Sequence, residues 1–131
     1  MSSQMILSRE EIATFARLSG DLNPLHHDEA HAQHTRFGGV IVSGPHLISL
    51  MMGLTATYFS RETAMLGLEF TFHFRKAVRA DEMIALEWEV VHVEPKASLQ
   101  GVIASLDGTV TNEQGQTALT GKGKILITAK L

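Results

Sequence analysis

Two side chains that could exchange protons lie near the start of the chain. Asp21 and His26 bound a short segment, Asp21-Leu22-Asn23-Pro24-Leu25-His26, and its Asn-Pro pair favours a turn. A carboxylate and an imidazole held at a fixed separation are the groups that general acid–base catalysis uses. Spacing alone leaves a simpler interpretation open, in which Asp21 caps the turn and His26 lies at the surface.

The start of an apolar segment, residues 46–59, is a second candidate for chemistry. Ser43 or Gly44 can cap a helix whose first turn contains Pro45. The free backbone N–H groups at a helix start attract negative charge, so the N–H of Gly44 could stabilise an oxyanion. Pro45 has no N–H to contribute. An ordinary buried helix start capped by Ser43 would account for the same residues.

The predicted helix also carries a narrow polar stripe. At about 100° per residue, four of its side chains fall within roughly 80° of one another: His46, Ser49, Gly53 and Thr57. The stripe could line a polar pocket. Alternatively, Ser49 and Thr57 could hydrogen-bond back to helix carbonyls, with Gly53 allowing close packing.

A cluster of histidines raises the question of a metal site. Its members are His26, His27, His31 and His34. His27 and His31 are four residues apart, but no His-Glu-x-x-His pattern and no further ligand set accompanies them. We therefore expect no metal, and solvated histidines on a helix explain the cluster equally well.

Helices flank the Asp21 to His26 segment. Ser8 and Glu11 have the spacing of a capping box, which predicts a helix that runs to about Ser19 and is ended by Gly20. Asp28 can cap a second short helix over residues 29–34. The helix predicted over residues 45–59 is apolar on nearly all sides, so we expect it to be buried.

The second half of the chain changes to the two-residue period of strands. We predict four of them, over residues 68–75, 84–91, 99–111 and 117–128, joined by short turns into an antiparallel sheet. A twisted sheet can wrap and bury the apolar helix, giving one α+β domain over residues 1–131. One sheet cannot easily cover the whole helix and also protect its own edge strands. Edge-to-edge pairing of two copies would solve both problems, so we expect a homodimer or a higher homo-oligomer.

Composition excludes several classes of protein. The 131 residues carry a net charge of −3, which gives no electrostatic footprint for nucleic acid. The absence of cysteine from the sequence excludes disulfides and a thiolate nucleophile and fits an expected cytoplasmic location. The central apolar segment is shorter than the roughly 20 residues that a membrane span needs, and the first residues lack the pattern of a secretory signal.

At this point two segments show a family pattern. Phe15-Ala16-Arg17-Leu18-Ser19-Gly20-Asp21-Leu22-Asn23-Pro24-Leu25-His26-His27-Asp28 resembles the hydratase motif of the MaoC-like (R)-specific enoyl-CoA hydratases, and residues 35–44 are also similar to that family. The resemblance implies a hot-dog fold, with an antiparallel sheet wrapped around a central helix. It also implies reversible syn addition of water to a trans-2-enoyl-CoA, which yields a (3R)-3-hydroxyacyl-CoA. Coenzyme A would then be part of the substrate, with no separate cofactor.

The resemblance also assigns residues. It implies that Asp21 and His26, not His27, form the catalytic pair, and that the N–H of Gly44 polarises the thioester carbonyl. We expect the substrate-binding residues to be Gly44, Ser43, His46, Ser49 and Asn23. Many family members have a histidine at the position of Ser43 and an apolar residue at that of His46, so these departures bear on the choice of acyl group.

Two other functions remain open from the sequence. A hot-dog thioesterase would usually carry a carboxylate on the central helix, and residues 45–59 contain none. A non-catalytic module that binds acyl thioesters would use Asp21 and His26 only as structural residues.

Overall fold

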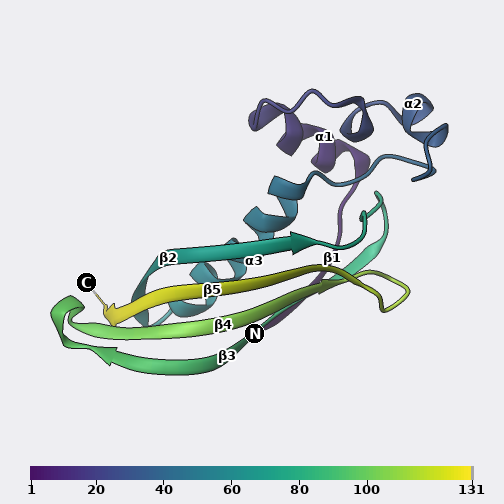
Figure 1. Cartoon of the computed structure of the whole chain (residues 1–131). Helices are drawn as coiled ribbons and strands as arrows, with labels where there is room; N and C mark the ends of the chain where they lie inside the picture. Colours follow the sequence, from purple (N-terminus) through teal and green to yellow (C-terminus); the bar gives the residue numbers. More distant parts are fainter. Residues whose placement is uncertain (131) are drawn as a thin grey trace.

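A computed structural model describes residues 1–130 (Figure 1). Helices gather at one end of the molecule, and a curved sheet with one long helix on it forms the rest. The elements in chain order are β1 (Ser2–Ile6), α1 (Arg9–Leu18), the 3₁₀ helix η1 (Pro24–His26), α2 (Glu29–Gln33), α3 (Gly44–Phe59), β2 (Thr63–Phe74), β3 (Met83–Lys96), the 3₁₀ helix η2 (Ala97–Leu99), β4 (Gly101–Thr111) and β5 (Thr117–Ala129).

The helices begin where the capping residues predict. The Ser8 hydroxyl accepts a hydrogen bond from the N–H of Glu11, and the Glu11 carboxylate accepts one from the N–H of Ser8, which completes the capping box of α1. Gly20 follows α1 with a φ of 76°, a conformation that glycine adopts readily. Asp28 caps α2, and Ser43 caps α3. The first residue of α3 is Gly44, one position before the predicted start at Pro45.

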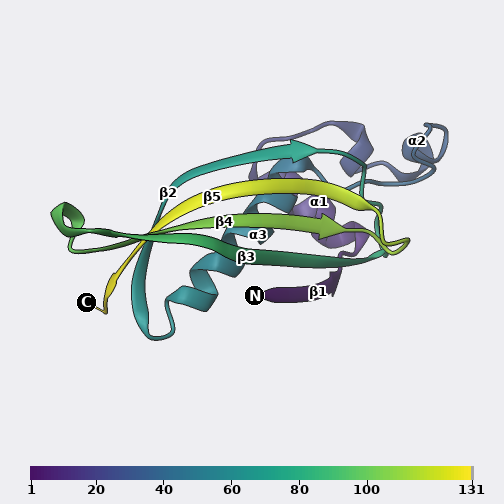
Figure 2. The same ribbon diagram turned by 60° about the horizontal axis from the view of Figure 1, so that its bottom comes forward.

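The sheet has five antiparallel strands in the order β1-β3-β4-β5-β2. The prediction of four strands was therefore wrong, because it did not include β1. β1 is only five residues long and lies at an edge, where it pairs with the first part of β3. β2 and β3 follow one another in the chain but lie apart in the sheet, since β4 and β5 separate them (Figure 2).

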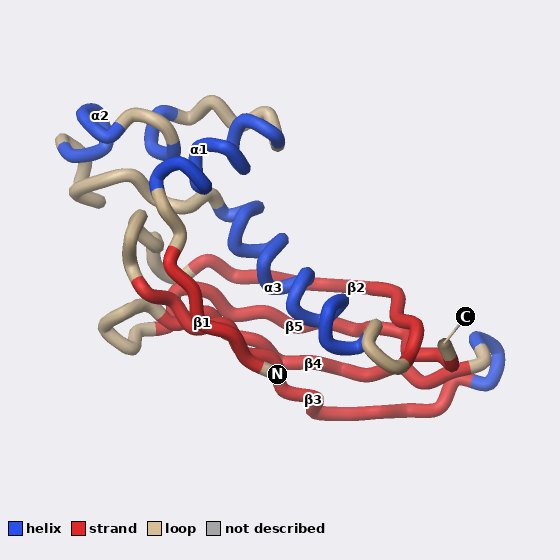
Figure 3. Tube along the Cα trace, turned by 180° about the vertical axis from the view of Figure 1, so that it is seen from behind, coloured by secondary structure: helices blue, strands red, loops and turns tan. Residues whose placement is uncertain are grey.

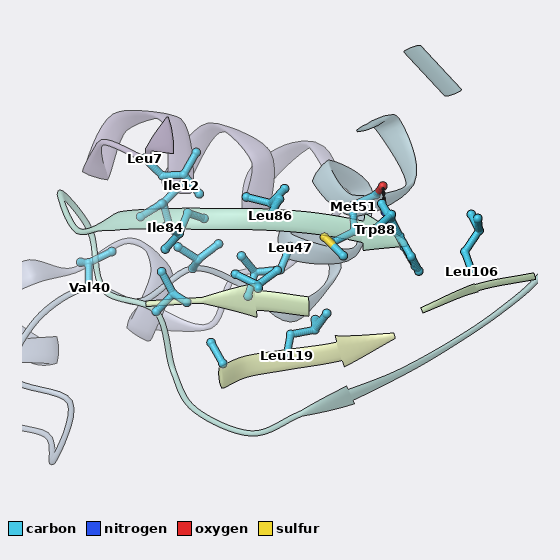
Figure 4. Packing of buried hydrophobic residues seen from close by; sticks show 14 of the residues in the cluster. Leu7, Ile12, Val40, Leu47, Met51, Ile84, Leu86, Trp88, Leu106 and Leu119 are labelled. Atoms are coloured by element: carbon cyan, nitrogen blue, oxygen red, sulfur yellow. Dashed lines mark hydrogen bonds between the residues drawn. The ribbon is translucent and has the colours of Figure 1, made fainter. Parts of the chain in front are cut away.

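The sheet curves around α3, and the main hydrophobic core fills the space between them. Trp88 of β3 is almost fully buried there, and its indole N–H donates to the backbone carbonyl of Met51 in α3 over 2.7 Å. Buried side chains from several strands and from α1 pack around this contact, and Figure 4 shows Leu47, Leu86 and Leu119 among them. Burial of apolar surface therefore fixes α3 to the sheet.

The single chain buries only one side of α3, as expected if one sheet cannot cover the whole helix. Leu47 and Met51 face the sheet, whereas Met52 and Tyr58 are 38% and 47% exposed. Figure 3 shows the open side of α3, which no other described element covers. The inner face of β2 is open in part as well: Phe70 and Phe72 are partly buried, but Leu68 and Phe74 are about half exposed, so the expected fully buried face is incomplete.

None of the helices within residues 1–130 combines the length and apolar character needed to cross a membrane.

Candidate active site

The loop after α1 brings Asp21 and His26 together. The N–H of Asp21 donates to the carbonyl of Ala16 over 2.8 Å, which fixes the residue at the helix end. One carboxylate oxygen, Oδ1, accepts from the N–H of Asn23 over 3.0 Å. The other, Oδ2, lies 3.4 Å from Nε2 of His26. The predicted proximity of these two side chains is therefore present in the folded chain.

The His26 ring is held in one orientation. It is buried in η1, and its Nδ1 lies 2.8 Å from the carbonyl oxygen of Ile41. A carbonyl only accepts hydrogen bonds, so Nδ1 must carry the proton of the neutral ring. Nε2 then presents a lone pair beside the Asp21 carboxylate. This places a base within reach of a proton donor bound next to both groups.

The same hydrogen bond ties the loop to the chain that leads into α3. Ile41 precedes the cap residue Ser43 by two positions, and the N–H of Ile41 in turn donates to the carbonyl of Leu25 over 3.0 Å. No sequence pattern indicates this connection, because a backbone carbonyl has no residue type to recognise.

Gly44 supplies the free donor at the start of α3. The N–H groups of His46 and Leu47 both donate to Ser43, and Pro45 has no N–H. Among the described residues, nothing accepts a hydrogen bond from the N–H of Gly44. This group lies at the positive end of the helix dipole and can therefore receive negative charge from a ligand.

A side chain at position 44 would collide with Phe74. A Cβ built on Gly44 would lie 2.7 Å from Cζ of the Phe74 ring, much closer than two carbon atoms pack. A Cβ at this position would therefore require the Phe74 ring or the start of α3 to move. Phe74 is a site residue that sequence reasoning missed, and the only signal for its position was the alternation of phenylalanines in β2.

Two other expected site residues, His46 and Asn23, have side chains with partners of their own. His46 stacks on Phe15 of α1, with 4.3 Å between ring centres, and the hollow beside it is lined by residues of α1. Its buried Nδ1 has no hydrogen-bond partner, and burial lowers the pKa of His46, against a smaller opposing effect of the Glu11 charge. Asn23 caps η1 through its side chain, which accepts from the N–H of Leu25.

Ser49 lies on the open side of α3. Gly53 and Thr57 of the same stripe are exposed too, whereas His46 is buried. The hydroxyl groups of Ser49 and Thr57 donate to no helix carbonyl in the described chain, so the stripe is not explained by bonds within the helix. Its role as a pocket wall stays a prediction. The described residues contain no group of three or more His, Cys, Asp or Glu side chains arranged to hold a metal ion.

An antiparallel sheet around a central helix defines a hot-dog protein, and His26 ties the Asp21–His26 pair to the chain that leads into this helix. The family model described as MaoC like domain matches residues 2–112, and the chain belongs to this family. The family prediction from the sequence is therefore confirmed.

Individual relatives agree with this assignment. The chain is 35% identical over 116 residues to an (R)-specific enoyl-CoA hydratase from Aeromonas caviae, an alignment that covers 88% of this chain and 82% of the relative. It is 29% identical over 90 residues to a 3-hydroxybutyryl-CoA dehydratase from Methylorubrum extorquens, covering 69% of this chain and 57% of that protein.

A solved structure confirms the predicted hot-dog fold. The (R)-hydratase from A. caviae involved in PHA biosynthesis superimposes with a TM-score of 0.86 at 30% identity, over 95% of this chain and 91% of the other.

Proposed function

We propose that this protein is a hydratase that adds water reversibly to a trans-2-enoyl thioester, with enoyl-CoA as the substrate and a (3R)-3-hydroxyacyl thioester as the product. The observation that carries the proposal is the pair formed by Asp21 Oδ2 and Nε2 of His26, 3.4 Å apart. The similarity to an (R)-specific enoyl-CoA hydratase supports the same reaction.

The pair is suited to hold a water molecule. The carboxylate of Asp21 and Nε2 of His26 are both acceptors, so they cannot hydrogen-bond to one another without a shared proton. A water molecule has two protons and can donate one to each group. Its oxygen lone pairs then point away from the pair and toward a substrate, which is the arrangement that a nucleophilic water needs.

The reaction then balances with groups of this chain alone. The water oxygen bonds to Cβ of the substrate and gives one proton to the Asp21–His26 pair. The Cα–Cβ π electrons move onto the thioester carbonyl, and the N–H of Gly44 stabilises the resulting enolate oxygen. The pair returns a proton to Cα, so that H and OH are added on the same face. The reverse sequence removes water from the 3-hydroxyacyl thioester.

Variants of the pair test the proposal. Asp21→Asn and His26→Ala should each lower kcat for hydration of crotonyl-CoA by about 10²–10⁴-fold, because each removes a proton acceptor. Matched controls are Asp107→Asn and His34→Ala, which make the same changes at exposed side chains outside the pair. Loss of enoyl absorbance measures hydration, and a thiol reagent measures release of free CoA.

The outcomes separate the candidate functions. Full activity in both pair variants would overturn the proposal. Release of free CoA by the wild-type protein would indicate a thioesterase, and binding of crotonyl-CoA without turnover would indicate a non-catalytic module.

A second copy of the chain is the natural cover for the open side of α3. β2 lies at the edge of the sheet and pairs only with β5, and its neighbour α3 exposes Met52 and Tyr58. An unpaired strand edge beside apolar surface favours association. The protein is therefore a homodimer in this proposal, with the two β2 edges side by side and the two α3 helices in contact.

Light scattering tests the dimer. The wild-type protein should have twice the mass of one chain, and Met52→Lys should lower it to that of a single chain, because a charge would be buried in the contact. Gln114→Lys, in the exposed turn between β4 and β5, should stay dimeric. A wild-type mass equal to one chain would overturn the dimer without affecting the proposed reaction.

A further inference from the structure

His27 directs its ring at the backbone of the residue whose carboxylate faces His26. Its Nε2 lies 2.7 Å from the carbonyl oxygen of Asp21. Neighbouring histidines thus contact two different groups of one aspartate. We propose that His27 is a positioning residue, which fixes the direction of the Asp21 carboxylate for catalysis. This inference rests on the proposed function. The proposed roles of Asp21 and His26 do not depend on it.

The proton positions follow from the partners. The Asp21 carbonyl can only accept, so Nε2 of His27 carries the proton and donates it. His26 has the opposite arrangement, because its Nδ1 donates to the carbonyl of Ile41. Adjacent rings therefore hold opposite tautomers. That difference gives one ring a basic Nε2 for chemistry and gives the other a donating Nε2 for support.

The supported carbonyl controls the carboxylate through the next peptide group. The carbonyl oxygen of Asp21 belongs to the peptide that joins Asp21 to Leu22, and the N–H of Asn23, which holds Oδ1, follows directly after it. A rotation of that peptide would displace the N–H of Asn23 and release Oδ1. The Oδ2 atom would then lose its fixed position 3.4 Å from His26.

No other described group holds this carbonyl. The N–H of Asp21 is fixed by Ala16, and the carbonyls of Asn23 and Pro24 accept from N–H groups inside the turn. Among the described residues, only the hydrogen bond from His27 Nε2, at the end of the turn, reaches the carbonyl of Asp21 at its beginning. His27 is partly buried, so water competes with this bond less than it would at the surface.

Two substitutions separate positioning from simple loop stability. His27→Gln keeps an N–H donor near the place of Nε2, whereas His27→Leu removes it at similar size. We expect His27→Leu to lower kcat for crotonyl-CoA hydration by about 10- to 100-fold with KM unchanged, because a small displacement of a catalytic group costs rate. His27→Gln should restore most of the rate. Thermal unfolding of both variants checks that their stabilities match.

Two kinetic outcomes would overturn the inference. One is a His27→Leu variant as fast as wild type, and the other is a His27→Gln variant as slow as His27→Leu at equal stability. Either result would leave the roles of Asp21 and His26 intact, since those are tested by their own variants.

A spectroscopic measurement needs neither activity nor a variant. In the wild-type protein labelled with ¹⁵N-histidine, NMR should find His27 protonated at Nε2 and His26 protonated at Nδ1 when both rings are neutral. A His27 ring protonated at Nδ1 alone would have no proton to donate to Asp21, and that result would overturn the inference even if every variant had failed to fold.

Discussion

The loop from Gly20 to Asp28 and the helix α3 are held in different ways. In the loop, short hydrogen bonds fix Asp21 through its N–H, its carbonyl and one carboxylate oxygen. In α3, burial of one apolar face fixes the helix, while the N–H of Gly44 and the opposite face stay open. The contact between Asp21 and His26 is therefore complete within one chain, whereas the helix offers unused surface and an unused donor to a ligand or a partner.

The strongest test of this contrast addresses the buried face of α3. Leu47 is 3% exposed, so Leu47→Ala should lower the free energy of unfolding by roughly 2–5 kcal/mol. Leu18 at the end of α1 is 83% exposed, and Leu18→Ala should change it by less than about 0.5 kcal/mol. Urea unfolding measures both. Similar values for the two variants would contradict the burial of α3 against the sheet.

A substitution at the start of α3 should act on the site instead. Gly44→Ala keeps the N–H but places a Cβ 2.7 Å from the Phe74 ring, so the helix start or the ring must move. We expect kcat/KM to fall about 100-fold. The double variant with Phe74→Ala should regain most of the activity, because the collision is gone. Phe74→Ala alone is the control, and a double variant as slow as Gly44→Ala would show that the ring is not the obstacle.

In the loop, a single cap should affect both stability and rate. Asn23→Ala removes the acceptor for the N–H of Leu25, at a cost of about 1 kcal/mol. Asn112→Ala is a matched control, since the Asn112 side chain also accepts backbone hydrogen bonds, in the turn before β5. Both variants should lose similar stability in urea unfolding. Only Asn23→Ala should lower kcat. Equal kcat values for the two variants would show that this cap does not affect catalysis.

The smallest effect concerns the pH dependence of the α1–α3 contact. Burial lowers the pKa of His46 below its ordinary value of 6.5, while the Glu11 charge opposes the shift. The unfolded chain therefore binds a proton at His46 before the folded chain does, and stability falls as the pH drops below 6.5 toward the lowered pKa. His46→Leu should weaken this dependence. Urea unfolding at several pH values measures it, and an unchanged slope would refute the contribution of His46.

Local signals in the sequence predicted most of the helices and the acid–base pair. The capping residues Ser8, Asp28 and Ser43 have side chains that satisfy free N–H groups, so they mark helix starts directly. The turn at Pro24 brings Asp21 close to His26 for an equally local reason. The six-residue segment from Asp21 to His26 allows this contact, but the spacing left other interpretations open, and the family resemblance assigned the pair.

Non-local features were beyond such reasoning. The place of β2 at the far edge of the sheet depends on which strands pair, and the period of a strand does not state its neighbours. The apolar pattern of α3 does not say which of its sides stays open in one chain, because apolar side chains do not show whether their own chain or another copy covers them. The bonds to the carbonyls of Ile41 and Asp21 involve backbone acceptors, which every residue has.

The single tryptophan of the sequence lies where α3 meets the sheet. Trp88 donates to the carbonyl of Met51 in α3 while its ring packs edge-on to Phe70 and Phe72 of β2. Any displacement of the helix changes the polarity around this one indole and therefore shifts the wavelength of its fluorescence emission. The fluorescence of Trp88 therefore reports the position of α3 against the sheet, with no competing signal from a second tryptophan.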